Sequence, residues 1–207
     1  MKISQIPGDE DLLRMMMAGD EDAFATLYRR RQGAIYRFAL HMSGSPEVAE
    51  DVTQEVFMTL IGDAGRYDPA RGSLASYLYG IARNHVLRRH GADRYYVQLL
   101  DDQDDEPPTV GAVAREDPFA DLARSEVIEA VRRGVLALPT HYREVIVLCD
   151  LHEMNYADAA AVLGCALGTV RSRLHRARKV LAEKLRAAAD SEPEPASETG
   201  AAARCLA

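Results

Sequence analysis

The sequence predicts an all-α protein of two small helical domains joined by a flexible acidic linker, with a helix-turn-helix in the second domain. Three observations predict this fold class. Apolar residues recur at helical spacing along most of the 207 residues, no convincing alternating strand is present, and an acidic segment containing Pro107 and Pro108 interrupts the helical pattern. The expected boundaries are a first domain at 1–96, a linker at 97–117, a second domain at 118–189 and a disordered tail at 190–207.

Four helices are expected in the first domain. A short one covers 9–18, and Asp20 is a good N-cap for a longer one that reaches about residue 41. Pro46 suits the first position of a third helix, to about residue 61, and Ser73 caps a fourth that ends near residue 90. The turn between the last two contains Asp68-Pro69 and Gly72.

The second domain is expected to contain a helix that begins beside Pro139 and then the helix-turn-helix. Asn155 is a good N-cap for a short helix, and Gly164 suits the left-handed conformation that ends it. The next helix places its apolar residues on one narrow stripe, at spacings of four, three and four: Val170, Leu174, Ala177 and Leu181. Ala166 is a poor cap for that helix, so its first residue is open.

This last helix is strongly basic although the whole chain carries a net charge of −7. Residues 167–187 contain seven Lys or Arg and a single acid, Glu183. Such a surface repels itself unless a polyanion neutralises it, which predicts DNA binding. We expect base-edge contacts from Ser172, His175 and Arg176, phosphate contacts from Arg173, Arg178 and Lys179, and either kind from Arg171.

An acidic amphipathic helix lies in the first domain. Val52, Val56 and Leu60 form its apolar stripe, and acidic or amide residues cover its other faces: Glu47, Glu50, Asp51, Gln54 and Glu55. Two interpretations stay open from the residues alone. The acids are either a solvated face or a docking surface for a basic partner protein.

Basic and aromatic residues alternate from residue 77 to residue 96. The arginines are Arg83, Arg88, Arg89 and Arg94, and the tyrosines are Tyr77, Tyr79, Tyr95 and Tyr96. This mixture suits single-stranded nucleic acid, since arginine binds phosphates and aromatic rings stack on unpaired bases. Some of the rings must belong to the core, because Tyr77 and Ile81 are four residues apart on one helical face.

Composition excludes several classes of protein. No apolar run is long enough to span a membrane and no signal peptide is visible, so membrane insertion is not expected. The three cysteines show no spacing typical of disulfide pairs, which favours a location in the reducing cytoplasm. No nucleophile–base constellation points to an enzyme and no motif to a cofactor. Cys149, His152 and Cys165 are a poor zinc signal, so a metal-dependent protein is a minor alternative.

Four short motifs, taken in order, resemble those of the extracytoplasmic-function (ECF) sigma factors, the small two-domain initiation subunits of bacterial RNA polymerase. The matching segments are 19–24, 49–57, 81–84 and 168–174, and the resemblance covers most of residues 10–187 without the linker. It implies that the chain directs core RNA polymerase to specific promoters and assists promoter melting.

The resemblance also implies residue roles. Asp51, Gln54, Glu55 and Phe57 match the helix that docks on the polymerase clamp, which favours the docking interpretation of the acidic helix. The segment 73–94 matches the part that captures the −10 element, with Tyr77, Arg83, Asn84, Arg88 and Arg89 as candidates. Residues 138–185 match the domain that recognises the −35 element, and the acidic linker matches the connector toward the polymerase active site.

Three positions depart from the family pattern. Tyr77 stands where Trp is common, Arg88 where an acid is common, and Ala166 where Pro or Ser is frequent. The expected partners are core polymerase, promoter DNA and an anti-sigma factor. The alternative is a helix-turn-helix transcriptional regulator with a sensory N-terminal domain, which would need a dimer and palindromic sites.

Overall fold

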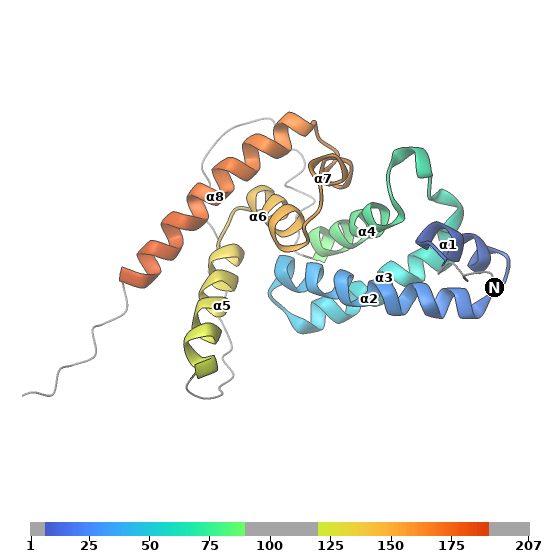
Figure 1. The fold of residues 1–207 in the computed structure, drawn as a ribbon, viewed down its shortest axis with the longest axis horizontal. Helices are drawn as coiled ribbons and strands as arrows, with labels where there is room; N and C mark the ends of the chain where they lie inside the picture. Colours follow the sequence, from blue (N-terminus) through green and yellow to red (C-terminus); the bar gives the residue numbers. More distant parts are fainter. Residues whose placement is uncertain (1–6, 90–119, 191–207) are drawn as a thin grey trace, which may run out of the picture.

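The computed structural model describes residues 7–89 and 120–190, with side chains described for 7–89 and 127–187, and these residues form helices and no strands. The expected linker (97–117) and nearly all of the expected tail (190–207) lie outside them. The first domain contains α1 (Asp9–Met17), α2 (Glu21–Ser43), α3 (Pro46–Asp63) and α4 (Leu74–Arg89), with the short 3₁₀ turns η1 (Ala64–Arg66) and η2 (Pro69–Arg71) before α4. The second contains α5 (Ala120–Leu136), α6 (Thr140–Ile146), η4 (Val147–Leu151), α7 (Tyr156–Leu163) and α8 (Leu167–Asp190) (Figure 1).

The expected helix starts are confirmed by the capping hydrogen bonds. Asp20 accepts from the amide of Ala23, and Ser73 accepts from the amide of Ser76. Pro46 stands at the start of α3 behind the cap Ser45. These side chains satisfy amides that have no partner inside the helix, so each helix begins where its cap lies.

The helix-turn-helix is formed by α7 and α8. Asn155 Oδ1 accepts from the amide of Asp158 at 2.9 Å, and Gly164 ends α7 in the left-handed conformation with φ of 63°. The helix α8 begins at Leu167, where the carbonyl of Ala166 accepts the first helical hydrogen bonds. Because Ala166 has no side-chain acceptor, α8 starts without a side-chain cap, as the sequence indicated.

One element was not expected. The α6 helix continues into the π-helical segment η4, in which the amide of His152 donates to the carbonyl of Val147 five residues earlier. This segment contacts α2 of the first domain. Glu153 follows with a positive φ of 52° and leads the chain into α7.

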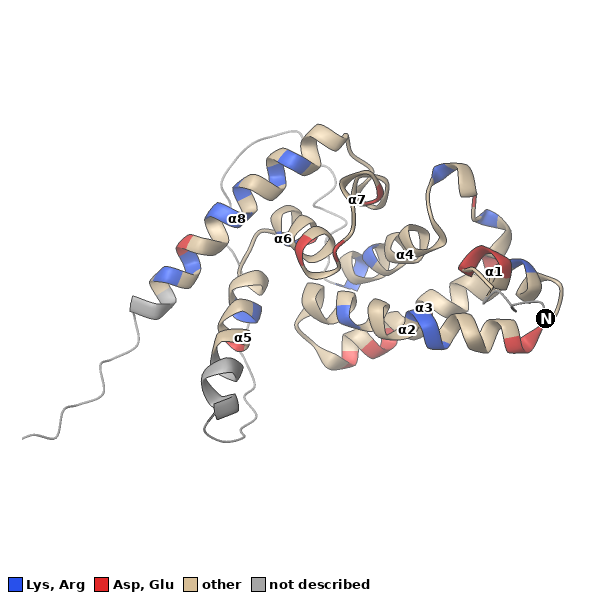
Figure 2. Ribbon diagram, viewed as in Figure 1, with Lys and Arg blue, Asp and Glu red and all other residues tan. Residues whose placement is uncertain are grey.

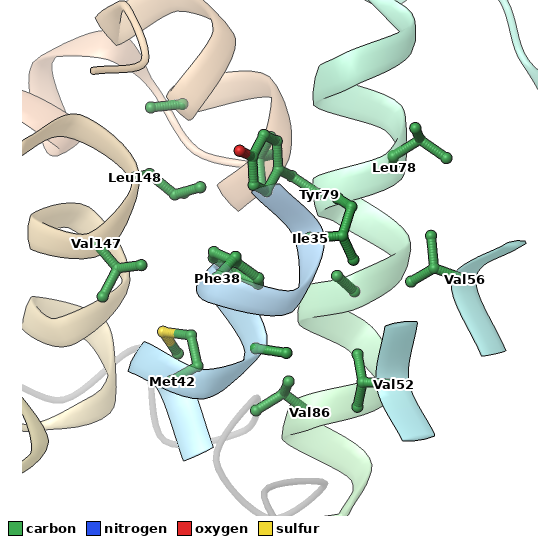
Figure 3. Close-up of a cluster of buried hydrophobic side chains, with 14 of the residues drawn as sticks. Ile35, Phe38, Met42, Val52, Val56, Leu78, Tyr79, Val86, Val147 and Leu148 are labelled. Atoms are coloured by element: carbon green, nitrogen blue, oxygen red, sulfur yellow. The ribbon is translucent and has the colours of Figure 1, made fainter. Parts of the chain in front are cut away.

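The core is continuous from one domain to the other. Leu27, Ile35 and Phe38 are buried along α2, between α3 and α4. Figure 3 shows Phe38 of α2 with Tyr79 of α4 on one side and Leu148 of η4 on the other. The sequence predicted two helical domains, and the structure adds that the two pack against each other through apolar side chains.

Three pairs of elements carry this packing. The α7 helix lies against α4, while η4 and the C-terminal part of α5 lie against α2 (Figure 1). At Gly44, which ends α2 with φ of 74°, an added Cβ would stand 3.0 Å from a methyl carbon of Leu136. Glycine is therefore required at position 44 for two reasons, since it adopts the left-handed conformation and leaves room for α5.

Candidate docking and nucleic-acid surfaces

The exposed face of α3 carries the acids that the sequence placed there. Asp51 and Gln54 are exposed and Glu55 is half-buried, while the stripe Val52, Val56 and Leu60 is buried against the rest of the domain. Figure 2 shows the acidic segment of α3 beside the basic end of α4. The surface is therefore acidic and accessible, as a docking surface for a basic partner requires.

The acids of α3 are partly neutralised by α4. Arg89 donates to Asp51 Oδ2 at 2.7 Å and to Glu55 Oε1 at 2.8 Å, and His85 Nδ1 lies 2.6 Å from Glu55 Oε2. Partial burial acts to raise the pKa of Glu55, but the hydrogen bond from Arg89 and the charge of His85 outweigh it and hold the pKa below its usual value. Arg89, expected at the −10 DNA, instead ties α4 to α3.

Phe57 requires a correction. It was expected on the docking surface, but its side chain is 3% exposed and packs against the ring of Tyr28, with a centroid distance of 4.7 Å. Phe24 contacts the same ring from α2. The physical reason is the helical period, because Phe57 lies four residues after the buried Thr53 and three before the buried Leu60, on the inner side of α3. It supports the acidic face from inside.

A cavity of about 560 Å³ lies where the η1–η2 segment meets α4. Tyr77 and Asn84, both expected at single-stranded DNA, line it from α4 together with Ser76. The preceding segment adds Arg66, Tyr67, Arg71 and Ser73 to the lining. Sequence reasoning did not select these four residues, although the alternation of basic and aromatic residues extends back to Arg66 and Tyr67.

The two tyrosines form one aromatic wall of this cavity. Their ring centroids are 5.6 Å apart, and the Tyr67 hydroxyl lies 2.9 Å from a carboxylate oxygen of Glu10 and 3.1 Å from the carbonyl of Gly72. Burial, with the hydrogen bond to Glu10, raises the pKa of Tyr67 to about 12, so its hydroxyl stays protonated and donates. Burial also raises the pKa of Tyr77. Such a wall, with arginines nearby, has the chemistry that binds an unpaired base and its phosphate.

Arg83 does not lie on the accessible surface with its neighbours. Its side chain is 9% exposed and its Nε donates to Glu144 Oε1 of α6 at 2.6 Å. Arg88, the remaining arginine expected here, is exposed and donates to the carbonyl of Asn84 in its own helix. The arrangement therefore brings Tyr77 and Asn84 together at one cavity and separates them from Arg83 and Arg89.

On α8 the structure separates the two faces that the sequence predicted. Val170, Leu174 and Ala177 are at most 2% exposed, and Leu181 is half-buried. The residues expected to contact DNA lie outside this stripe, and five of them are exposed and make no ion pair in the described part of the chain: Arg171, Ser172, His175, Arg176 and Lys179. The row of basic residues along α8 is visible in Figure 2.

The remaining two residues of that set have partners or are half-buried. Arg178 is exposed but its guanidinium binds both carboxylate oxygens of Asp150 in η4, at 3.0 and 2.6 Å. This contact raises the pKa of Arg178. Arg173 is half-buried, and its charge acts on Glu144. Arg178 is therefore fixed in orientation, whereas Arg171 and Arg176 project freely from the helix.

Among the described residues, no group of three or more His, Cys, Asp or Glu is arranged to hold a metal ion. His152, one of the three residues of the zinc alternative, instead accepts a hydrogen bond from Tyr79 or donates one to it, with 2.8 Å between Nδ1 and the hydroxyl. Burial, with the charges of His41 and Arg37, lowers the pKa of His152 to about 4, so its ring is neutral at neutral pH. No helix within 7–89 and 120–190 combines the length and apolarity needed to cross a membrane.

Comparison with known families matches both halves of the chain. Residues 27–94 match the model of Sigma-70 region 2, and residues 128–181 match that of Sigma-70, region 4. The first match contains α3, α4 and most of the residues that line the cavity, and the second contains the helix-turn-helix.

Individual relatives agree. The chain is 35% identical over 181 residues to the ECF RNA polymerase sigma factor SigM of Mycobacterium tuberculosis, covering 86% of this chain and 84% of the relative. It is 29% identical to SigW of Bacillus subtilis, covering 84% and 95%. It is 33% identical to SigE of Mycolicibacterium smegmatis, where the match spans 81% of this chain but 64% of the relative.

Two solved structures share the fold. The sigma factor RpoE in complex with the anti-sigma factor NepR from Bartonella quintana matches with a TM-score of 0.59 and 28% identity, over 79% of this chain and 96% of that one. CnrH in complex with the cytosolic domain of CnrY matches with a TM-score of 0.63 and 27% identity, over 86% and 97%. With both sigma regions in order around an acidic helix and a basic helix-turn-helix, the chain belongs to the ECF sigma factor family.

Proposed function

We propose that the three surfaces divide the work of a sigma factor that directs RNA polymerase to promoters. The acidic face of α3 docks on core polymerase, α8 recognises the −35 element as duplex, and the cavity beside α4 captures an unpaired base of the −10 element. The domains that carry these roles are the first (1–96) and the second (118–189), joined by the segment 97–117. As an initiation factor working on polymerase and chromosome, the protein would act in the cytoplasm.

The observation that carries the proposal is the orientation of α8. Its apolar stripe is buried, so Arg171, His175 and Arg176 are held outward along one exposed helix face. A helix presented in this way fits the major groove, where arginine can bind a guanine through two hydrogen bonds. The match of residues 27–94 to Sigma-70 region 2 favours this function over the alternative of a helix-turn-helix regulator with a sensory N-terminal domain.

The cavity supplies the second half of the mechanism. Taking a base out of the stack costs a few kcal/mol, which contacts with the protein must offset. Stacking on an aromatic side chain is worth about 1–3 kcal/mol per base, and Tyr67 and Tyr77 provide the rings. The hydroxyls of Ser73 and Ser76 and the amide of Asn84 supply donors and acceptors for the base edge.

Run-off transcription with purified core polymerase and a library of promoters tests the function directly. The full-length chain should confer start-site selection on core enzyme and define a promoter. Transcription no different from that of core enzyme alone would contradict the proposal.

The docking role of α3 has its own test. Glu55→Lys should abolish co-purification with core polymerase, since it replaces an acid facing a basic partner with a cation. Glu21→Lys is the control, because Glu21 is exposed on α2, outside the acidic face of α3, and makes no ion pair among the described residues. If Glu55→Lys co-purifies as well as the unchanged protein, the docking assignment is wrong.

A partner is suggested by one of the solved relatives, which is held by an anti-sigma factor. We extend this to the present chain and expect it to bind an anti-sigma factor. Co-purification of the tagged chain from its own host would identify it.

A further inference from the structure

The aromatic wall of the cavity that we propose for the −10 base includes a residue outside any helix. Tyr67 lies between the short turns η1 and η2, in the segment that joins α3 to α4. Apart from Tyr67, every residue from Gly65 to Arg71 is exposed. A segment with so few buried contacts is easily displaced unless polar contacts hold it. The side chain of Tyr67 makes such contacts.

The Tyr67 hydroxyl connects three parts of the first domain. It donates to Glu10 Oε1 of α1 at 2.9 Å, and the carbonyl of Gly72, just before α4, lies 3.1 Å away as a second acceptor. A phenol has one hydrogen to donate, and an ionised carboxylate accepts more strongly than a neutral carbonyl, so Glu10 is the main acceptor. The ring of Tyr67 lies beside that of Tyr77 in α4, with 5.6 Å between the centroids.

Glu10 is held in place by the anchoring of α1. The preceding residue, Asp9, binds the guanidinium of Arg30 at 2.7 Å and also that of Arg31, which ties α1 to α2. Leu12 of α1 is buried in the core. Glu10 makes no ion pair among the described residues, so its carboxylate is available to Tyr67. Figure 1 shows α1 beside the segment that leads into α4.

Glu10 is not among the residues that line the cavity. The lining comes from α4, from the segment before it, and from Ala161 and Val162 of α7. A carboxylate also repels the phosphates of a nucleic-acid strand. Any benefit of Glu10 to strand binding must therefore act through Tyr67 and against the direct effect of its own charge. The match to Sigma-70 region 2 begins at residue 27, so α1 precedes the part of the chain that this match covers.

We propose that Glu10 is a positioning residue for the −10 base. By accepting the hydrogen bond of the Tyr67 hydroxyl, it fixes the segment 65–72 and holds the Tyr67 ring beside Tyr77, where an unpaired base stacks. The inference rests on the proposed function and adds a residue of α1 to it. The α1 helix thereby takes part in promoter melting without contacting DNA.

Strand binding by holoenzyme, reconstituted from the full-length chain and core polymerase, tests the proposal. The probe is a short fluorescent non-template strand with the −10 element of a promoter that the run-off assay selects, and its scrambled sequence is the reference. Glu10→Ala removes the acceptor, while Tyr67→Phe removes the donor and keeps the ring. Glu21→Ala is the matched control, since Glu21 is an exposed acid in the first turn of α2 and makes no ion pair among the described residues.

We expect Glu10→Ala and Tyr67→Phe each to weaken binding of the promoter strand about fivefold relative to the scrambled strand, as for the loss of one hydrogen bond. The double variant should lose no more than either single variant, because both changes remove the same bond. Glu10→Gln should stay within about twofold of the unchanged protein, since its amide oxygen still accepts from the hydroxyl. Glu21→Ala should bind the strand as the unchanged protein does.

The sign of the effect separates positioning from simple electrostatics. Loss of an acid by itself favours binding of an anionic strand, so Glu10→Ala would then bind more tightly. Unchanged or tighter binding by Glu10→Ala would overturn the proposal, as would a Glu10→Gln variant as weak as Glu10→Ala. Additive losses in the double variant would overturn it too, because the two residues would then act separately.

An abasic substitution, placed at each position of the strand in turn, tests whether the captured base is the one affected. The captured base is the position at which the unchanged holoenzyme loses most affinity. At that position Glu10→Ala should lose about fivefold less than the unchanged protein, because its contact with the base is already weakened. An equal loss in both proteins would contradict the positioning role.

Binding of the −35 duplex by the free chain should be equal in all variants, since α8 belongs to the other domain. A parallel loss for the duplex would show that Glu10 serves the fold rather than the base. If the unchanged chain supports no run-off transcription, the proposed function itself fails. If it supports transcription and Glu10→Ala binds the strand equally well, only the role of Glu10 is rejected.

Discussion

The surface beside α4 that we propose for the −10 element and the surface of α8 that we propose for the −35 element carry the same kinds of side chain but differ in what packs on them. Arg83 of α4 is covered by α6 and bound to Glu144, while Arg176 of α8 is exposed. Both were selected from the sequence as DNA contacts. The difference teaches that a motif places a basic residue on a helix, whereas its availability depends on the rest of the fold.

The two surfaces also differ in how much stability is lost when their ion pairs are broken. Arg83–Glu144 is buried, whereas Arg178–Asp150 is partly exposed, with side chains 55% and 29% exposed. Exposed pairs contribute about 0–1 kcal/mol, while breaking a buried pair costs about 3–5 kcal/mol. Changes at the covered surface should therefore alter stability most, and changes at the open surface should alter DNA binding.

The largest effect is expected from Arg83→Ala, which leaves Glu144 buried without its partner. We expect the free energy of unfolding to fall by about 3–5 kcal/mol, measured by urea denaturation. Replacing both residues, with Arg83→Met and Glu144→Met, should recover most of the loss because no charge remains buried. A single variant within 1 kcal/mol of the unchanged protein would show that the pair is not buried in solution.

The second largest effect is expected from lowering the pH, which should weaken the packing between the two domains. In the structure, where the two domains are packed together, the pKa of His152 is about 4, against an ordinary value of 6.5. Burial and the charges of His41 and Arg37 lower it. Above pH 6.5 the ring is neutral whether the domains are packed or apart, so stability does not change. As pH falls from 6.5 toward 4 the separated form binds a proton that the packed form excludes, and the packed form loses at most about 1.4 kcal/mol per pH unit.

Urea denaturation at pH 7, 6 and 5 measures this dependence. His41 should add to it, since burial and the charges of Arg132 and Arg37 also lower its pKa. His152→Gln is the control, because an amide can still accept from Tyr79 but does not titrate in this range. If the free energy of unfolding of His152→Gln falls between pH 7 and pH 5 as much as that of the unchanged protein, the buried histidine does not cause the pH dependence.

At the open surface, Arg176→Ala should weaken promoter binding by about 1–3 kcal/mol and relax specificity, as expected for loss of a base contact. Fluorescence anisotropy with the −35 duplex and with scrambled duplex measures both effects. Stability should be unchanged, since Arg176 is exposed and makes no ion pair in the described part of the chain. An equal loss on both duplexes would assign Arg176 to phosphates instead.

The smallest effect is expected from Arg178→Ala. Its pair with Asp150 is exposed, so the free energy of unfolding should fall by about 0–1 kcal/mol. If Arg178 also contacts a phosphate, the slope of log affinity against log salt should fall by about 1. An unchanged salt slope would confine Arg178 to holding α8 against η4.

Local features of the fold could be predicted from the sequence because they depend on neighbouring residues. Asp20, Ser73 and Asn155 cap their helices as expected, since a cap bonds an amide three residues away. The stripe from Val170 to Leu181 likewise follows from the helical period alone. The sequence by itself therefore determined the all-α class, the helix-turn-helix and, through short motifs, the family.

Only the tertiary structure decided which candidate residues are accessible. Arg83 and Glu144 are 61 positions apart, and no local period relates them. The η4 segment, the share of α7 in the cavity and the pairing of Arg89 with Asp51 and Glu55 arise in the same way, from packing between distant helices. Local patterns fix the direction in which a side chain leaves its helix, but burial depends on the helix that arrives from elsewhere in the chain.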